Sequence, residues 1–233
     1  MNEYERNYGN YGVQENAMVV TMNKVYSWMT LALVATALTA MYVAQSETIL
    51  GIIFGNQAMP WILMLIEVGV VMYLSARINR ISYATAVTLF GVYSILNGVV
   101  LSVILLIYEL STIYAAFFAT AGTFAAMSFI GYTTKKDLSG LGGILTMALI
   151  GLIIASLVNL FFHNDTMTSI ITYVGVFIFV GLTAYDTQKI KQMLMYSNGA
   201  DQRKIGIMGA LSLYLDFINL FLYILRLLGN RRD

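Results

Sequence analysis

Two aspartates in the C-terminal part of the chain are the side chains best suited to chemistry. Asp216 lies in the middle of a long apolar stretch, residues 205–228, and Asp186 ends the apolar stretch before it. A carboxylate at the centre of a bilayer costs about 2.5 to 3.5 kcal/mol, so it usually faces a partner, a cavity or a transport path. Two carboxylates brought close together cannot both ionise easily and titrate as a unit. The pair therefore predicts a proton-sensitive site.

The last apolar stretch carries polar residues on one side. Four of them share one helical face, at spacings i−4, i, i+3 and i+7. They are Ser212, Asp216, Asn219 and Tyr223. We expect this polar stripe to face the protein interior. Two plainer interpretations stay open: Asp216 as a structural residue tied to a hydroxyl or an arginine, and Asp186 as a solvated residue at a helix end.

Other polar side chains within apolar stretches also need partners. Glu67 lies inside residues 60–76 between aliphatic neighbours and is a third acid of this kind. Arg77 follows at the end of the same stretch and is a basic candidate for reaching acids of neighbouring helices. Asn97 and Asn159 are expected to form hydrogen bonds between helices.

The composition indicates that these apolar stretches lie in a membrane. The chain has 233 residues, of which 59% are hydrophobic and 11% charged, whereas a soluble domain carries about 25% charged residues. Seven stretches approach the roughly 20 apolar residues that a spanning helix needs, and they lack the alternation of barrel strands. We therefore predict an all-α, multi-pass bundle of seven transmembrane helices. The stretches are residues 27–44, 60–76, 83–107, 112–131, 141–162, 169–185 and 205–228.

The N-terminal segment differs from the rest. It is polar, rich in Tyr and Asn, and without the basic start and apolar core of a cleavable signal peptide. We predict a flexible cytoplasmic tail at residues 1–22 and a transmembrane domain at residues 23–233. The chain has no cysteine, so disulfides and thiolate metal sites are excluded. Its formal net charge of +1 points to no polyanionic partner. We expect the lipid bilayer as a partner and no nucleic acid.

Lysine and arginine near the spans fall in alternate connections. The connections between them contain neither residue, so the positive-inside rule places the N-terminus in the cytoplasm. Seven full crossings would put the C-terminal arginines on the opposite side. Either the basic residues of the earlier loops determine the orientation despite these arginines, or the last segment does not cross the membrane fully. The basic residues of the alternate connections are Lys24, Arg77, Arg80, Lys135, Lys136, Lys189, Lys191, Arg203 and Lys204.

Two further expectations concern connections and packing. Residues 187–204 form the longest internal connection, which we expect to be a cytoplasmic turn flanked by helix ends. Small residues inside the spans are expected to permit close contact between helices. They include Gly122, Ala126, Gly143, Gly151 and Ala155.

Three segments carry a family resemblance. They are GYTTKKDLSG at residues 131–140, FVGLTAYDTQKIK at 179–191 and LSLYLDFINLFLYILRLLG at 211–229. Together they closely resemble the bacterial branch of the Bax inhibitor-1/YccA family. The resemblance runs from about Val25 to the C-terminus. It implies a bacterial inner-membrane protein of seven helices in which the last helix is wrapped by the other six.

The resemblance also implies an activity, a pH-sensitive calcium leak. Asp186 and Asp216 match the aspartate pair that acts as its latch, and Glu67 matches an acid of the second span that joins them. An arginine also joins the latch; ungapped alignment puts Ile78 at its position, with Arg77 one residue earlier. Calcium takes six to eight oxygen ligands, so two aspartates make a weak, transient site. Such weakness suits a leak, because a conducted ion must leave easily. No tightly bound cofactor is expected.

An enzyme is one alternative. Intramembrane aspartyl proteases also carry a Tyr-Asp on the sixth span and a catalytic Asp on the seventh, and two carboxylates sharing a proton can activate water. Here Tyr214 and Leu215 precede Asp216 in place of a Gly-x-Gly sequence, and no proline follows Pro60. We therefore expect no enzymatic activity. His163, the single histidine, has no nucleophile motif beside it and is expected to cap a helix or meet water.

An interaction protein is the other alternative. Some bacterial members of the family bind a membrane-anchored ATP-dependent protease of the AAA class and modulate its turnover of membrane proteins. The tail at residues 1–22 could make such a contact, but its composition equally suits a disordered stub.

Overall fold

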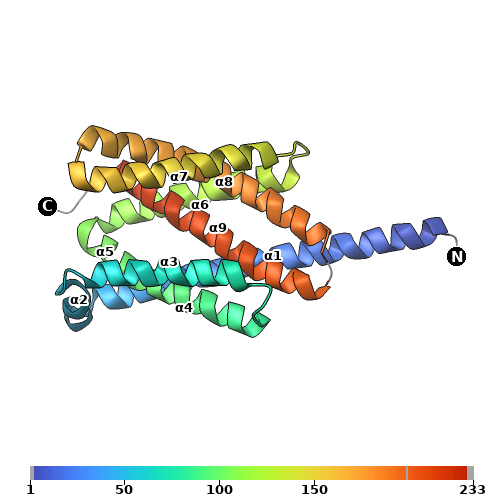
Figure 1. Cartoon of the computed structure of the whole chain (residues 1–233), viewed down its shortest axis with the longest axis horizontal. Helices are drawn as coiled ribbons and strands as arrows, with labels where there is room; N and C mark the ends of the chain where they lie inside the picture. Colours follow the sequence, from blue (N-terminus) through green and yellow to red (C-terminus); the bar gives the residue numbers. More distant parts are fainter. Residues whose placement is uncertain (1–2, 198, 230–233) are drawn as a thin grey trace. The chain divides into compact units, whose positions relative to one another are not determined.

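The computed structural model describes residues 3–197 and 199–229 (Figure 1). It is 88% helical, and the described residues form no strand, so the prediction of an all-α fold is confirmed. The helices are α1 (Glu3–Ala44), α2 (Glu47–Phe54), α3 (Met59–Arg77), α4 (Tyr83–Leu101), α5 (Ile104–Ile107), α6 (Leu110–Thr133), α7 (Ser139–Phe162), α8 (Asp165–Met195) and α9 (Gly199–Leu228).

Seven segments within the described residues are long and apolar enough to span a membrane, which confirms the number expected from the sequence. The third of them combines α4 and α5. The short α2 is too short to span a bilayer. The candidate spans are Asn16–Ala44, Met59–Arg77, Tyr83–Ile107, Leu110–Thr133, Ser139–Phe162, Asp165–Met195 and Asp201–Leu228.

The chain divides into two compact units. Unit 1 comprises Met1–Val103 and Ile190–Leu211, and unit 2 comprises Ile104–Lys189 and Ser212–Asp233. The division falls inside α8 and α9, so both helices contribute residues to both units. The two acids singled out by the sequence belong to unit 2.

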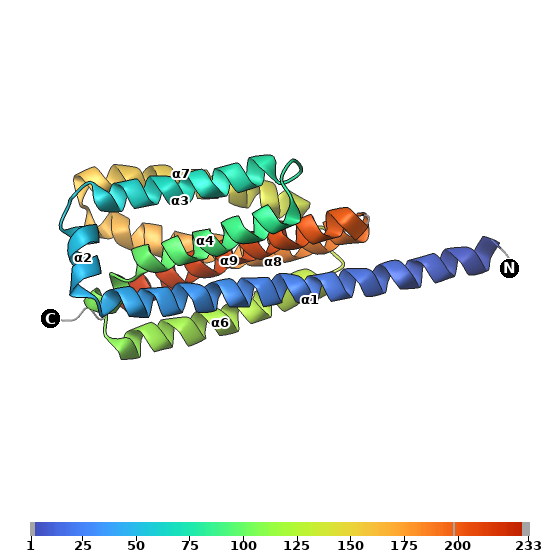
Figure 2. The same cartoon turned by 90° about the horizontal axis from the view of Figure 1, so that it is seen from below.

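Unit 1 is organised around α4, against which α1 and α3 both pack. Figure 2 shows α1 and α4. The hydroxyl of Thr36 in α1 donates to the carbonyl oxygen of Ser94 in α4 at 2.9 Å. A methyl group on Gly98 would overlap the carbonyl oxygen of Thr36. Since glycine has no Cβ, the backbones of α1 and α4 can approach closely at this point.

The N-terminal helix begins earlier than the sequence predicted. We expected a separate tail at residues 1–22, but α1 runs as one helix of 42 residues from Glu3, seen as a single rod in Figure 2. Met18 and Met22 are only 3% and 2% exposed, so the packed part of α1 starts before residue 23. The prediction rested on hydropathy, which marks the edge of a membrane and not the end of a helix. The flexibility of the segment stays a prediction.

The connection expected at residues 187–204 is also mostly helical. α8 continues to Met195 and α9 begins at Gly199, so helix ends flank the break in this segment, as expected, but the break is much shorter than the segment. The charged and polar residues of this segment include several good helix formers, such as Lys, Gln and Met. They end the apolar pattern without ending the helix.

Unit 2 contains α5, α6, α7, most of α8 and the part of α9 from Ser212 onward, which are labelled in Figure 1. Its close helix contacts lie at glycines that the sequence did not single out. Added methyl groups would overlap the backbone of Ala184 at Gly131, the ring of Tyr185 at Gly142 and the ring of Tyr223 at Gly175. These overlaps fix where α6, α7 and α9 can approach α8.

The glycines named from the sequence behave differently. A methyl group on Gly122, Gly143 or Gly151 would meet no neighbouring atom within 4 Å among the described residues. The expectation of close contact at these three glycines was therefore wrong. Gly142 and Gly143 are adjacent in the chain, and only the orientation of α7 about its axis decides which of them faces α8.

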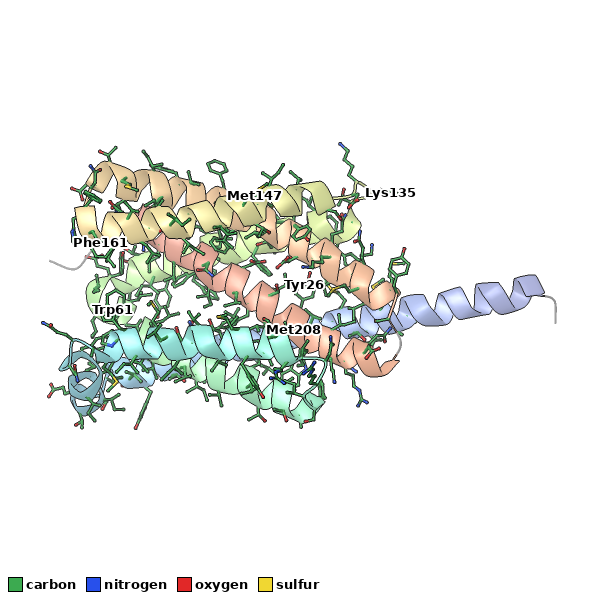
Figure 3. The ribbon with its side chains drawn as sticks, in the orientation of Figure 1. Tyr26, Trp61, Lys135, Met147, Phe161 and Met208 are labelled. Atoms are coloured by element: carbon green, nitrogen blue, oxygen red, sulfur yellow. The ribbon has the colours of Figure 1, made fainter. Side chains whose placement is uncertain are left out.

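Burial differs strongly among the candidate spans. The most apolar window of the last span is 61% buried, compared with 6% for the spans of α3 and α7. Side chains such as Met147 and Phe161 of α7 are largely exposed and are labelled in Figure 3. Exposed apolar side chains on a spanning helix are suited to contact with lipid. The central position of the last helix stays a prediction.

Candidate functional site

The candidate site lies on α9 within unit 2. Ser212 and Asp216 are separated by four residues and therefore lie one above the other on one face of α9, about 6 Å apart along its axis. Leu213 and Leu225, on other faces of the helix, are fully buried. The apolar residues of α9 thus hold the helix by packing, while the Ser212–Asp216 face carries the polar groups.

Asp186 of α8 is attached to this face. The hydroxyl of Ser212 donates a hydrogen bond to Asp186 Oδ2 at 2.6 Å. Asp186 therefore contacts the residue one helical turn from Asp216, and the two acids lie within electrostatic range of each other. The sequence predicted that two acids on consecutive segments could meet, and the structure brings them into one neighbourhood.

Asp216 is the more deeply buried acid. Its side chain is 5% exposed, and its Oδ2 atom has no hydrogen-bond partner among the described residues. Burying a charge without a partner is costly in a medium of low polarity. An oxygen in this position can accept a proton or bind a cation, either of which would offset that cost. Asp216 is therefore a buried carboxyl group with one oxygen that lacks a partner among the described residues.

The end of α8 around Asp186 is fixed by its neighbours in unit 2. Thr187 donates from its hydroxyl to Ser128 of α6 at 3.3 Å. Thr187 itself is fully buried. The close contact of Ala184 with Gly131 fixes the preceding turn of α8 against the same helix. The segment of α8 that carries Asp186 therefore packs against α6, while Asp186 itself bonds to α9.

The remaining members of the polar stripe have separate roles. Asn219 donates to the carbonyl oxygen of Leu215 on its own helix at 2.8 Å. Tyr223 stacks on Phe179 with ring centroids 5.8 Å apart, and the guanidinium of Arg226 lies 5.6 Å from the Tyr223 ring centroid. Among the described hydrogen bonds, the one from Ser212 connects the stripe to Asp186.

Glu67 and Arg77 belong to unit 1. Glu67 Oε1 accepts a hydrogen bond of 3.3 Å from Asn97 of α4, which confirms Asn97 as a residue that bonds between helices. Arg77 is exposed in the last turn of α3. The part that Glu67 and Arg77 play in a common site with the two aspartates stays a prediction.

The polar residues at the far end of α7 are structural. Asn159 donates to Thr168 of α8 at 2.7 Å, as expected for a hydrogen bond between helices. His163 is exposed and ends α7 as its C-cap residue, with a left-handed backbone at φ 49°. The expectation that this histidine caps a helix is confirmed.

The chemistry open to the site is that of two carboxyl groups and one hydroxyl. Within residues 3–197 and 199–229, no group of three His, Cys, Asp or Glu side chains is arranged to hold a metal ion. Asp186, Asp216 and Ser212 could offer a passing cation oxygen atoms, and the carboxyl pair could hold a proton.

Several residues around Asp186 were missed from the sequence. Thr187, Gln188 and Ser128 are buried and make side-chain hydrogen bonds in unit 2. A signal was present, since Thr187 and Gln188 are polar residues directly beside a membrane-embedded acid. Periodicity on one helix cannot identify their partners, because these lie 50 or more residues away in the chain.

Comparison with known proteins identifies the family of the chain. A family model described as Inhibitor of apoptosis-promoting Bax1 matches residues 18–233, so the match begins at buried Met18 of α1. The inner membrane protein YbhL of Escherichia coli K12 is 47% identical over 224 residues, covering 94% of this chain and 96% of that protein. An uncharacterized protein of Borreliella burgdorferi is 43% identical over 226 residues, covering 94% and 97%. An uncharacterized membrane protein of Streptococcus pyogenes serotype M1 is 42% identical over 161 residues, covering 69% and 70%. With its seven candidate spans, the chain therefore belongs to the Bax inhibitor-1/YccA family of multi-pass membrane proteins.

Proposed function

We propose that this protein is a pH-sensitive calcium leak channel gated by the carboxyl pair of Asp186 and Asp216. The hydrogen bond of 2.6 Å from Ser212 to Asp186 carries the proposal, because it anchors one acid a single helical turn from the other. Both acids belong to long apolar helices. Ionisable residues in such helices usually mark ion or proton pathways.

The protonation of the pair is the proposed switch. Two carboxyl groups within electrostatic range share protons and titrate together. When both are ionised, they present two negative charges and several oxygen atoms to a calcium ion. When the pair holds a proton, its negative charge falls and its attraction for calcium falls with it. Calcium flux should therefore follow the titration of the pair.

The incomplete ligand set supports conduction over tight binding. Calcium takes six to eight oxygen ligands, and Asp186, Asp216 and Ser212 supply only part of such a set. Water would complete the coordination of an ion in transit. A site of this kind binds weakly, and conduction needs an ion to leave as easily as it enters.

Glu67 and Arg77 are proposed as further residues of the ion pathway. Glu67 is a partly buried carboxyl group inside α3 with an amide partner, Asn97. Arg77 supplies a positive charge at the end of the same helix. We further propose that the protein lies in the inner membrane with its N-terminus in the cytoplasm, as the distribution of lysine and arginine indicates.

Calcium flux into liposomes that contain the purified protein tests the proposal. The parent should show a flux that changes with pH, and Asp186→Asn and Asp216→Asn should each make the flux nearly independent of pH. Asp137→Asn is the matched control, because Asp137 is an exposed acid of the α6–α7 connection. If Asp216→Asn keeps the parent's pH dependence, the carboxyl pair is not the gate.

A further inference from the structure

Gln188 is a buried residue two positions after Asp186, and the proposed gate does not use it. It is 6% exposed. Its Nε2 group donates to the carbonyl oxygen of Lys136 at 2.8 Å, and its Oε1 atom accepts from the backbone N–H of Leu138 at 2.8 Å. One amide side chain therefore binds the backbone on both sides of Asp137, in the connection between α6 and α7.

These hydrogen bonds lie at the start of α7. Leu138 is the N-cap residue of α7 and provides no side-chain capping hydrogen bond. Lys136 is exposed and Leu138 is half-buried, and the buried Gln188 side chain supplies one hydrogen bond to the backbone of each. The connection is thereby fastened to α8.

The three residues from Asp186 to Gln188 contact three different elements. Successive side chains of a helix point about 100° apart. Asp186 accepts from Ser212 of α9, Thr187 donates to Ser128 of α6, and Gln188 holds the α6–α7 connection. Asp186 and Gln188 are thus about 200° apart, on nearly opposite sides of α8. Contacts on opposite sides of a helix fix its rotation about its own axis.

The two residues before Asp186 restrict the position of α8 in the same way. A methyl group at Gly131 of α6 would overlap the backbone of Ala184, and one at Gly142 of α7 would overlap the ring of Tyr185. α8 therefore packs tightly against both helices at this point. With the position of α8 restricted by packing, its rotation decides the direction in which the Asp186 side chain leaves the helix.

We propose that Gln188 is a positioning residue for Asp186. By binding Lys136 and Leu138, it fixes the rotation of α8 and keeps the Asp186 carboxylate on the Ser212 hydroxyl. The importance of this placement rests on the proposed function, in which Asp186 is half of the gate.

Infrared spectroscopy of protein labelled with ¹³C-aspartate and reconstituted in liposomes tests this role. The carboxylate band that moves in Ser212→Ala identifies Asp186. Gln188→Met keeps the length of the side chain and removes both hydrogen bonds. We expect it to move the same band in the same direction. Exchange of the Leu138 amide hydrogen should become about five- to tenfold faster, as for the loss of one hydrogen bond.

Gln202 provides a matched control. It is also a buried glutamine, 8% exposed, and donates to the carbonyl oxygens of Leu194 and Ser197 at 3.2 and 3.3 Å. Gln202→Met should leave the Asp186 band at the parent's position. If Gln188→Met speeds exchange at Leu138 but leaves the band unmoved, Gln188 only fastens the connection, and the positioning role is wrong.

If Gln188→Met does not fold, a second variant tests the same role. Gln188→Glu keeps the acceptor for Leu138 and loses the donor to Lys136, so it should move the band part of the way, and an unmoved band would overturn the proposal. The band can be measured without any calcium flux. A parent protein that conducts no calcium would therefore refute the proposed function, while the infrared result would still decide the role of Gln188.

Discussion

Ser212 joins α9 to α8 by donating a hydrogen bond of 2.6 Å to Asp186. Removing one partner of a hydrogen bond to a carboxylate costs about 1.5 to 3 kcal/mol. We expect Ser212→Ala to lower the free energy of unfolding in detergent by roughly this amount and to alter the pH dependence of calcium flux. Ser169→Ala is the control, because Ser169 is exposed and bonds only its own helix backbone. Equal stability of the two variants would contradict the importance of the Ser212–Asp186 bond.

Replacement of Asp216, unlike that of Ser212, is expected to raise the stability of the protein. Its Oδ2 atom is buried without a hydrogen-bond partner among the described residues. A buried polar group without a partner costs about 1 to 3 kcal/mol, which an apolar side chain of similar size avoids. We expect Asp216→Leu to raise the midpoint of thermal unfolding and to abolish pH-dependent flux. A fall in stability together with retained flux would show that Asp216 has neither a strained environment nor a role in the gate.

Gly131 is expected to be essential for the contact between α6 and α8. The methyl group of Gly131→Ala would overlap the backbone of Ala184, and overpacking of this kind typically costs about 1 to 3 kcal/mol. Gly122→Ala, in the same helix, meets no neighbour and should be neutral or stabilising by up to about 1 kcal/mol. Thermal unfolding of the two variants checks the difference, and similar midpoints would count against the close contact.

Asp137 has a pH dependence of its own outside the membrane. Hydrogen bonds from the side chain and the backbone N–H of Ser139 lower the pKa of Asp137 below its ordinary value of 3.8. A lowered pKa means that the folded state favours the carboxylate. The stabilisation is complete above the ordinary pKa and is lost as the pH falls through the folded-state pKa. Ser139→Ala should raise the pKa of Asp137 toward 3.8, as measured by NMR titration of its carboxyl carbon. An unchanged pKa would show that the backbone bond alone is responsible.

The alternative of an intramembrane protease makes a different prediction. We expect the reconstituted protein to leave a model transmembrane substrate intact at every pH tested. The chain lacks the glycines before Asp216 and the later proline of those enzymes. Cleavage that disappears in Asp186→Asn would assign the carboxyl pair to hydrolysis in place of ion conduction.

Hydropathy and helical period were sufficient to predict much of the fold and part of the site. The seven spans follow from the length and composition of apolar stretches. The shared face of Ser212 and Asp216 follows from their spacing. Asn97 and Asn159 were expected to bond between helices, and both do so. Each of these predictions could be made from a single stretch of the sequence. For the polar residues it also used the free-energy cost of burying a polar group without a partner.

Relationships between distant segments could not be predicted in the same way. The partner of Ser212 depends on the rotation of α8, and this rotation depends on contacts such as those of Thr187 with Ser128 and of Gln188 with Leu138. Nothing in the sequence of α8 alone shows which of its faces meets which neighbour. The ends of α1 and α8 were misplaced for another reason. A helix can continue beyond the apolar stretch, because charged residues at its end remain hydrated outside the membrane.

The length of α8 bears on how the gate would respond to voltage. Its 31 residues extend for about 46 Å, whereas the hydrocarbon core of a bilayer is about 30 Å thick. Counted from Asp165, the first 21 steps of the helix cover about 32 Å and end at Asp186. If α8 enters the membrane at Asp165, Asp186 lies where the field across the bilayer has almost ended. Its protonation would then follow the acidity of the adjacent compartment and depend little on the membrane potential.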